Sequence, residues 1–270
     1  MSLTDFAKFI SANKLSWNKR TPVHTASRFY DVEGFRRGHI SLNFIEQEEL
    51  EPVKGKSLLH LQCHFGLDTL SWARLGARVT GIDFSERSIQ TAKELALDEQ
   101  VMHAEFHCCD VYDTPSVIGD ARFDIVFTSY GAISWLPDID RWAKVIAQHI
   151  KPRGTFYMVE FHPFLRTIDD DGILKYSYFY REQPYEDPES GTYTDGGDLF
   201  SSKSYDWQHT ISDVVNALIT VGFRIELLNE FPFSVYNCFP GMIEIEPGKW
   251  VFENVGATIP YLFSVKARRA

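Results

Sequence analysis

The sequence has few cysteines, and their spacing argues against two classes of protein. Only Cys63, Cys108, Cys109 and Cys238 occur among 270 residues, and no Cys-x-x-Cys pair is present. Four cysteines are too few for a disulfide framework in a chain of this length, and adjacent cysteines lack the spacing of a zinc site. We therefore expect reduced thiols, a cytoplasmic protein and no bound metal.

Basic charge is also scarce. The chain has 27 Lys and Arg residues against 37 Asp and Glu residues, a formal net charge of -10, and no dense run of Lys or Arg. Nucleic-acid phosphates are bound by clustered positive charge, so this composition disfavours a nucleic-acid partner.

Long hydrophobic runs are absent as well. Apolar stretches such as Asp124–Phe127 fall far short of the roughly 20 residues that span a bilayer. Residues 1–17 mix polar and apolar side chains, without the continuous apolar segment of a secretory signal. We expect neither a membrane partner nor a secretory signal.

The rest of the composition is that of a globular protein, with 44% hydrophobic and 24% charged residues. The length suits one domain with appendages. We expect an N-terminal extension over residues 1–56 and a main domain over residues 57–270. Residues 163–208 are weakly periodic and rich in Asp, Tyr, Gly, Pro and Ser, which favours an inserted cap over an ornamental surface loop. A monomer and a homodimer are both compatible with this organisation.

Short apolar runs alternate with amphipathic stretches along most of the main domain, a pattern typical of parallel strands joined by helices. We therefore predict an α/β fold with a doubly wound, Rossmann-like sheet. The predicted strands are residues 57–61, 78–83, 104–108, 123–128, 155–161, 223–228 and 259–265. The main predicted helices are residues 67–75, 85–96, 138–150 and 210–221.

One glycine turn and two acidic residues indicate a ligand site at the carboxyl ends of these strands. Gly66 follows the first predicted strand, and Asp83 and Asp110 end the second and third. A carboxylate in the position of Asp83 accepts hydrogen bonds from ribose hydroxyls. The dinucleotide pattern Gly-x-Gly-x-x-Gly needs three glycines, whereas Leu61–Gly66 supplies one. A cofactor without phosphates therefore fits better.

Five segments, taken in order, resemble the motifs of the class I S-adenosylmethionine-dependent methyltransferases. The closing pair of strands fits the extra antiparallel strand of that family. The resemblance implies a seven-stranded, mostly parallel sheet with an antiparallel last strand and an N-terminal helical extension. The sequence departs from the family at Gln62 and His64, where glycines are usual, and at His60, where an acid is usual. The five segments are residues 58–69, 79–85, 109–111, 123–127 with Trp135–Asp138 after it, and 150–155.

The resemblance also implies the cofactor, S-adenosylmethionine, and the residues that bind it. Asp83 would hold the ribose, Asp110 and Val111 the adenine, and residues 61–66 the methionine portion, while Phe84 would pack on the adenosine. The full expected set is Leu61, Gln62, Cys63, His64, Gly66, Asp83, Phe84, Ser85, Asp110, Val111, Ser129 and Tyr130.

Two histidines are candidates for the catalytic base. Methyl transfer is an in-line displacement that depends mainly on positioning, and a base is needed only where the acceptor must lose a proton. His162 ends the fifth predicted strand beside the expected cleft, and His209 precedes the late helix. Imidazole titrates in the useful range. The alternative is a histidine hydrogen-bonded within a loop for His162, and a capping or packing histidine for His209.

The extension before residue 57 supplies the candidates for acceptor binding. In related methyltransferases such an extension folds over the cofactor and helps to form the acceptor pocket. Tyr30, Arg36 and Arg37 are expected to contact the acceptor or the cofactor carboxylate, because guanidinium pairs with carboxylates through two donors. Trp135 is expected to wall the acceptor site. The alternatives are a solvated Arg pair on a surface helix and a core tryptophan.

The acceptor itself is expected to be a small molecule, methylated at oxygen or nitrogen. Thr128–Gly131 replaces the Asn/Asp-Pro-Pro-Tyr/Phe motif of enzymes that methylate base amino groups, and the acidic balance agrees. Two alternatives stay open. One is a protein that binds S-adenosylmethionine without catalysis, and the other is an NAD-dependent oxidoreductase.

Overall fold

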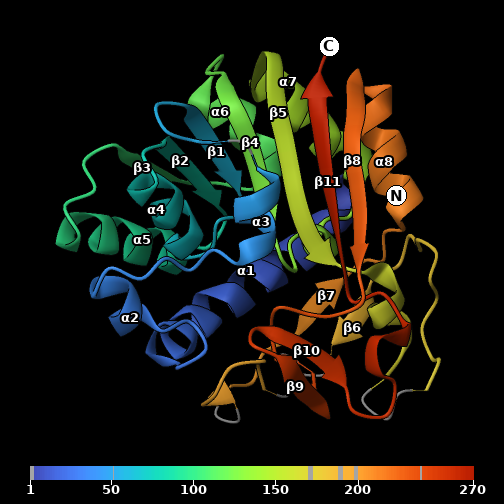
Figure 1. Cartoon of the computed structure of the whole chain (residues 1–270). Coiled ribbons are helices and arrows are strands. Elements are labelled where there is room, and N and C mark those ends of the chain that lie inside the picture. The colour runs from blue at the N-terminus through green and yellow to red at the C-terminus, as the bar shows by residue number, and fades with distance from the viewer. Residues whose placement is uncertain (1–2, 51, 170–172, 188–190, 198–199, 238) are drawn as a thin grey trace.

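A seven-stranded sheet forms the centre of the molecule (Figure 1). The computed structural model describes residues 3–50, 52–169, 173–187, 191–197, 200–237 and 239–270. The strand order in the sheet is β3-β2-β1-β4-β5-β11-β8. The strands are β1 (Ser57–Leu61), β2 (Arg78–Asp83), β3 (Ala104–Cys108), β4 (Phe123–Ser129), β5 (Ile150–Phe161), β8 (Phe223–Phe231) and β11 (Leu262–Arg269).

The sheet is mostly parallel, as predicted. β1 pairs in parallel with β2 and β4, β2 with β3, and β4 with β5. The last strand, β11, runs antiparallel to both of its neighbours, β5 and β8. Successive residues of β1, such as Leu58 and Leu59, are fully buried on opposite faces. Because both faces of the sheet are buried, the central strands are nearly continuous apolar runs in the sequence.

Helices cover both faces of this sheet. Helices α7 and α8 bury residues such as Trp142 and Leu218 against one face, and α3 and α4 bury Ile45 and Trp72 against the other. α5 packs beside α4, where Leu95 joins a third apolar cluster. The helices are α1 (Leu3–Ala26), α2 (Val32–Arg36), α3 (Phe44–Glu49), α4 (Leu67–Arg74), α5 (Glu86–Asp98), α6 (Thr114–Ile118), α7 (Ile139–His149) and α8 (Ile211–Thr220).

Three parts of the fold differ from the sequence prediction. β5 begins at Ile150 instead of residue 155, because the predicted turn is absorbed into the strand with positive φ at Arg153 and a register shift opposite residues 123–125. β11 begins and ends later than the predicted range of 259–265. The hairpin of β9 (Met242–Glu246) and β10 (Lys249–Phe252) was not predicted.

Helix α1 and the cap segment lie at the carboxyl ends of the parallel strands. Figure 1 shows α1 crossing beneath this edge, with the β9–β10 hairpin and the short strands β6 (Tyr185–Asp187) and β7 (Ser204–Asp206) below it. Within the 163–208 segment, residues 170–172, 188–190 and 198–199 lie outside the described part of the chain. These placements leave one edge of the sheet covered by three segments distant in sequence.

Two expectations from the sequence, on the cysteines and on membrane-spanning helices, can be compared with the structure. Cys63, Cys108 and Cys109 carry free thiols, and Cys238 lies outside the described residues. Among the helices described, none has the length and apolar character needed to cross a bilayer.

Helix α8 begins with a capping box at Thr210. The Thr210 hydroxyl accepts a hydrogen bond from the Asp213 backbone N–H at 3.1 Å, and the Asp213 carboxylate accepts one from the Thr210 N–H at 2.8 Å. Thr210→Ala removes the first bond, so we expect the free energy of unfolding in urea to fall by about 1 kcal/mol. Thr210→Ser keeps the hydroxyl and serves as the control. Equal losses in both variants would contradict this role.

Candidate active site

The expected cofactor residues meet at one edge of the sheet. Leu61 lies opposite Ile82, and Asp83 opposite Cys108, in parallel registers. Because the strands are parallel, the loops that follow them open at the same edge. The segments brought together there are Leu61–Gly66, Asp83–Ser85, Asp110–Val111 and Ser129–Tyr130.

The loop between β1 and α4 has a strained backbone. Gln62, His64 and Gly66 have φ values of 59°, 52° and 81°, a region that side-chain-bearing residues rarely adopt. The Gln62 amide donates to the Ala132 carbonyl at 2.7 Å, which ties this loop to the one after β4. At Gly66 a Cβ would lie 2.8 Å from the Phe106 ring. Strain of this kind concentrates at functional sites.

Asp83 is held in a fixed orientation at the end of β2. One carboxylate oxygen accepts from the His64 N–H at 2.9 Å and the other from the Ser85 N–H at 2.9 Å. Burial nevertheless raises the pKa of Asp83 to about 6. Phe84, next in the chain, is partly buried. The site therefore holds an oriented carboxyl group whose charge is incompletely compensated.

The neighbouring loops are ordered by local hydrogen bonds. The Asp110 carboxylate accepts from the Tyr112 N–H at 2.9 Å, and burial raises the pKa of Asp110. Val111 is buried at the start of a single 3₁₀ turn. Ser85 caps α5 by accepting from the Ser88 N–H at 3.1 Å. These contacts place a second carboxylate beside the Asp83 loop.

Aromatic rings from α1 cover the β1–α4 loop. The Trp17 ring lies 4.9 Å from that of His64 and 5.3 Å from that of Trp135, measured between ring centroids. Trp135 therefore packs against the ring that covers this loop.

A chain of hydrogen bonds joins α1, the loop and the cap through two histidines. His24 Nδ1 lies 3.0 Å from His64 Nε2, and His24 Nε2 lies 2.8 Å from the Thr192 hydroxyl. His64 Nδ1 lies 3.0 Å from the Ser88 hydroxyl. Burial lowers the pKa of His24 to about 3 and that of His64 well below 6.5, so both rings are neutral at pH 7. No local sequence pattern singles out His24.

Tyr30 lies at this site, whereas the predicted arginines do not. The Tyr30 ring stacks on His24, and its hydroxyl lies 2.5 Å from that of Tyr193 in the cap. Arg36 instead pairs with Asp98, the last residue of α5.

Arg37 is the C-cap residue of α2. Its side chain is exposed, with a guanidinium nitrogen 4.0 Å from the Asp31 carboxylate. Among the described residues, the structure pairs Arg36 and Arg37 with Glu33, Asp98 and Asp31, and with none of the other expected site residues. It favours the alternative of a solvated pair on a surface helix.

Two acidic residues that the sequence analysis did not select lie beside Ser129 and Tyr130. Glu46, 0% exposed, accepts from the Tyr130 hydroxyl at 2.7 Å and from the Asn43 N–H at 2.6 Å. Asp68 accepts from the Ser129 hydroxyl at 3.2 Å. Burial raises the pKa of Glu46 to about 8. The Asn43-x-x-Glu46 spacing signals a capping box, but not this burial.

His162 has no ring nitrogen free to act as a base. Nδ1 accepts from the Phe164 N–H at 3.1 Å, and Nε2 lies 2.8 Å from the Glu230 carboxylate on β8. These contacts tie the end of β5 to an edge strand. They favour the alternative of a histidine hydrogen-bonded within a loop.

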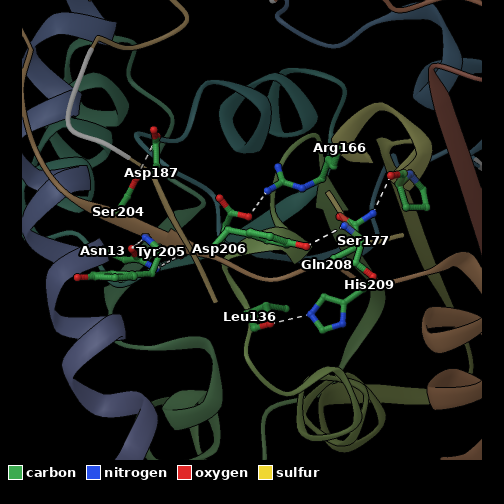
Figure 2. A network of polar contacts seen from close by, with 12 residues as sticks. Asn13, Leu136, Arg166, Ser177, Asp187, Ser204, Tyr205, Asp206, Gln208 and His209 are labelled. Carbon is green, nitrogen blue, oxygen red and sulfur yellow. Dashed lines mark hydrogen bonds and ion pairs between the residues drawn. The ribbon is translucent and has the colours of Figure 1, made fainter. Parts of the chain in front are cut away.

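His209 keeps one nitrogen unpaired. Nε2 lies 2.7 Å from the Leu136 carbonyl, as Figure 2 shows, and Nδ1 is buried with no hydrogen-bond partner among the described residues. The Tyr180 ring stacks on the imidazole with centroids 5.5 Å apart. Of the two predicted bases, only His209 therefore presents a free ring nitrogen.

The cap segment is fastened to the rest of the molecule around His209. Asn13 of α1 exchanges two hydrogen bonds of 2.7 Å with the backbone of Tyr205 in β7. Within the cap itself, Arg166 pairs with the Asp206 carboxylate of β7 (Figure 2). The cap and α1 thus pack as one cover.

Comparison with known proteins agrees with this architecture. Residues 58–154 match the family model described as a methyltransferase domain. Among solved structures, a putative S-adenosylmethionine-dependent methyltransferase from Listeria monocytogenes superposes with a TM-score of 0.61 at 19% identity, covering 83% of this chain and 94% of that one. The DhpI–SAH complex gives 0.56 at 15% identity, covering 97% of both chains. Residues 58–154 therefore resemble a methyltransferase domain, and the chain has the fold of these S-adenosylmethionine-dependent methyltransferases.

A curated relative of similar sequence is the ubiquinone biosynthesis O-methyltransferase of Coxiella burnetii. The two are 32% identical over 172 residues, which cover 61% of this chain. The match spans 66% of that relative's length.

Proposed function

We propose that this protein transfers the methyl group of S-adenosylmethionine to a small-molecule acceptor, at oxygen in preference to nitrogen. The observation that carries the proposal is the buried Asp83 carboxylate, oriented at the end of β2 in a sheet of this strand order. The sequence similarity to an O-methyltransferase supports oxygen as the acceptor atom.

The residues at the carboxyl edge fit this cofactor. An ionised carboxylate offers about four lone-pair sites, and backbone N–H groups occupy one on each Asp83 oxygen. The remaining sites would accept hydrogen bonds from the two ribose hydroxyls. Hydrogen bonds from the two ribose hydroxyls would also lower the pKa of Asp83 and so offset the effect of burial.

The neighbouring residues would complete the site. Asp110 and Val111 would bind the adenine, and the loop of residues 61–66 the methionine portion. When bound, S-adenosylmethionine supplies an electrophilic methyl group, and the protein's task is to orient the acceptor and exclude water. We assign the covering role to the extension of residues 1–56 and the cap of residues 163–208. The acidic surface and free thiols are consistent with work in the cytoplasm.

His209 is the proposed proton acceptor. Its Nδ1 is unpaired, and burial lowers the pKa of His209, so the ring stays neutral and able to accept a proton at pH 7. His162 has both nitrogens engaged and is assigned a structural role instead.

Calorimetric titration and product analysis test the proposal together. S-adenosylmethionine and S-adenosylhomocysteine are titrated separately into the wild-type protein. The protein is then incubated with S-adenosylmethionine and a panel of phenols, catechols and amines, and methylated products are detected by mass spectrometry. We expect both cofactor forms to bind and S-adenosylhomocysteine to accumulate only with an acceptor present.

Two other outcomes of these experiments would contradict the proposal. Binding without turnover on any acceptor would support a non-catalytic binder instead. Binding of NAD without S-adenosylmethionine would support the oxidoreductase alternative and overturn the proposal.

A further inference from the structure

A small cavity of about 30 Å³ lies beside His209, at the carboxyl ends of β4 and β5. This volume accommodates a group the size of a water molecule or a hydroxyl. Part of its lining is apolar, from Ile133, Phe161 and Pro163. It also borders Gly131, two residues after Ser129, so it adjoins the loop expected at the cofactor.

Three residues that line this cavity carry a buried polar atom with no hydrogen-bond partner among the described residues. The atoms are Trp207 Nε1, Arg166 Nε and His209 Nδ1. The side chains of Trp207 and His209 are almost completely buried, with 1% and 4% exposed. Buried polar groups are nearly always hydrogen-bonded, so three unpaired atoms around one cavity point to a polar occupant.

The hydrogen-bonding character of the three atoms follows from their chemistry. Trp207 Nε1 and Arg166 Nε carry hydrogens and can only donate. His209 Nε2 faces the Leu136 carbonyl at 2.7 Å, and a carbonyl oxygen can only accept. Nε2 therefore carries the hydrogen of the neutral ring, and Nδ1 is the acceptor. The residues that line the cavity thus include two donors and one acceptor that have no partner among the described residues.

The charges around the cavity disfavour an anionic occupant. Glu160 also lines it, and the carboxylate accepts from the backbone N–H groups of Ala132 at 2.7 Å, Ile133 at 3.1 Å and Phe161 at 2.7 Å, and from Gly131. Its lone pairs are thus already occupied. The guanidinium of Arg166 is paired with Asp206. A carboxylate or phosphate bound here would face the negative charge of Glu160. The charge of Arg166 could not balance it, because Arg166 is already paired with Asp206.

We propose that this cavity binds the hydroxyl group of the methyl acceptor, through Trp207, Arg166 and His209. A hydroxyl has one hydrogen to donate and two lone pairs to accept with, which matches one acceptor and two donors. A protonated amine has no lone pair for the two N–H groups, and a carboxylate has no hydrogen for His209. This inference rests on the proposed methyltransferase function and narrows its acceptor to alcohols or phenols.

The reaction at this position balances. As the hydroxyl oxygen forms its bond to the methyl carbon, the methyl–sulfur bond breaks and its electron pair stays on sulfur. The hydroxyl proton passes to His209 Nδ1, and the resulting imidazolium donates through Nε2 to the Leu136 carbonyl. The N–H groups of Trp207 and Arg166 stabilise the charge that develops on oxygen. The proton then leaves to solvent.

Binding of phenol tests the site without requiring turnover. Phenol and its methyl ether, anisole, are titrated by ligand-observed NMR against the wild-type protein, with and without S-adenosylhomocysteine. We expect phenol to bind at least about tenfold more tightly than anisole, because the ether has no hydrogen to donate and is larger. Equal affinities, or no phenol binding at all, would overturn the inference and leave a cavity that holds water only.

Trp207→Phe removes one N–H group and keeps an aromatic ring. This substitution is expected to lower the affinity for phenol about tenfold, which is the effect of losing one buried hydrogen bond. Trp142→Phe is the matched control, since Trp142 Nε1 is also buried and unpaired but does not line the cavity. An equal effect of both substitutions would indicate a general packing defect and overturn the assignment.

His209→Gln keeps a donor toward the Leu136 carbonyl and removes the Nδ1 acceptor. With a hydroxylated acceptor, we expect kcat to fall about 100-fold or more while the affinity for S-adenosylhomocysteine is unchanged. Unchanged kcat, or turnover of amines alone, would overturn the inference while leaving methyltransferase function intact. Failure of the wild-type protein to bind the cofactor would instead count against the proposed function.

Discussion

Replacing Asp83 by Asn is expected to lower the affinity for S-adenosylmethionine by about 100-fold or more. The substitution removes the charge that strengthens the proposed bonds to both ribose hydroxyls, and charge-assisted bonds contribute about 1.5–3 kcal/mol each. The amide oxygen of Asn can still accept from one of the two backbone N–H groups that orient Asp83. Calorimetric titration of both cofactor forms into the variant measures the loss.

Asp124→Asn provides the matched control. Asp124 lies near the start of β4, at the opposite edge of the sheet, where it pairs with Lys151 at 2.8 Å. Its substitution changes the net charge equally but should leave cofactor affinity within about twofold. A similar loss in both variants, or none at Asp83, would remove Asp83 from the ribose site.

The wild-type protein should also bind the cofactor less tightly as pH falls from 7 to 5. Burial raises the pKa of Asp83 to about 6, so the carboxylate that accepts two donors is progressively replaced by a carboxylic acid over this range. Because binding favours the charged form, affinity is highest above pH 6. Asp83→Asn should lack this dependence.

Replacing Glu46 by Gln is expected to change how stability depends on pH. Burial raises the pKa of Glu46 from 4.5 to about 8, so the folded protein holds a proton that the unfolded chain releases above pH 4.5. Stability from this group is complete below pH 4.5 and is lost as pH rises toward 8. Between pH 5 and 8 the variant should gain about 3 kcal/mol of unfolding free energy relative to wild type.

Urea denaturation at pH 5, 6.5 and 8 measures this difference. Gln is close to Glu in shape, and it can accept from the Asn43 N–H and donate to the Tyr130 hydroxyl. Glu48→Gln, on the exposed side of the same helix, is the control for the change in net charge. Parallel pH profiles for Glu46→Gln and wild type would show that Glu46 is ionised throughout.

The sheet could be predicted from the sequence because its strands are short, buried on both faces and separated by helices with local start signals. Ser85 is one such signal, and it does cap α5. The start of β5 was missed because Pro152 and Gly154 are typical of a turn, whereas pairing with β4 extends the strand through them. Strand pairing with β4 therefore outweighs the local turn preference of Pro152 and Gly154.

Some residues of the candidate site could likewise be selected from the sequence, and others could not. Gly66 and Asp83 could be selected because each sits at a fixed place in a strand–turn–helix motif. His24 and Glu46 could not, because they lie in the extension and reach the site only through packing of helices whose positions no local pattern encodes. The ion pairs of Arg36 and Arg37 could not be predicted for the same reason, since residue type alone says nothing about which way α2 faces.

The shared cover of α1 and the cap has a kinetic consequence. Asn13 is fastened to Tyr205, His24 to Thr192, and the Trp17 ring lies between the loops after β1 and β4. In the proposed methyltransferase, a ligand seated under these rings would leave only when both segments separate, and opening of this kind takes far longer than side-chain motion. Spent cofactor and methylated product would then depart during one opening event, and that event would limit the turnover rate.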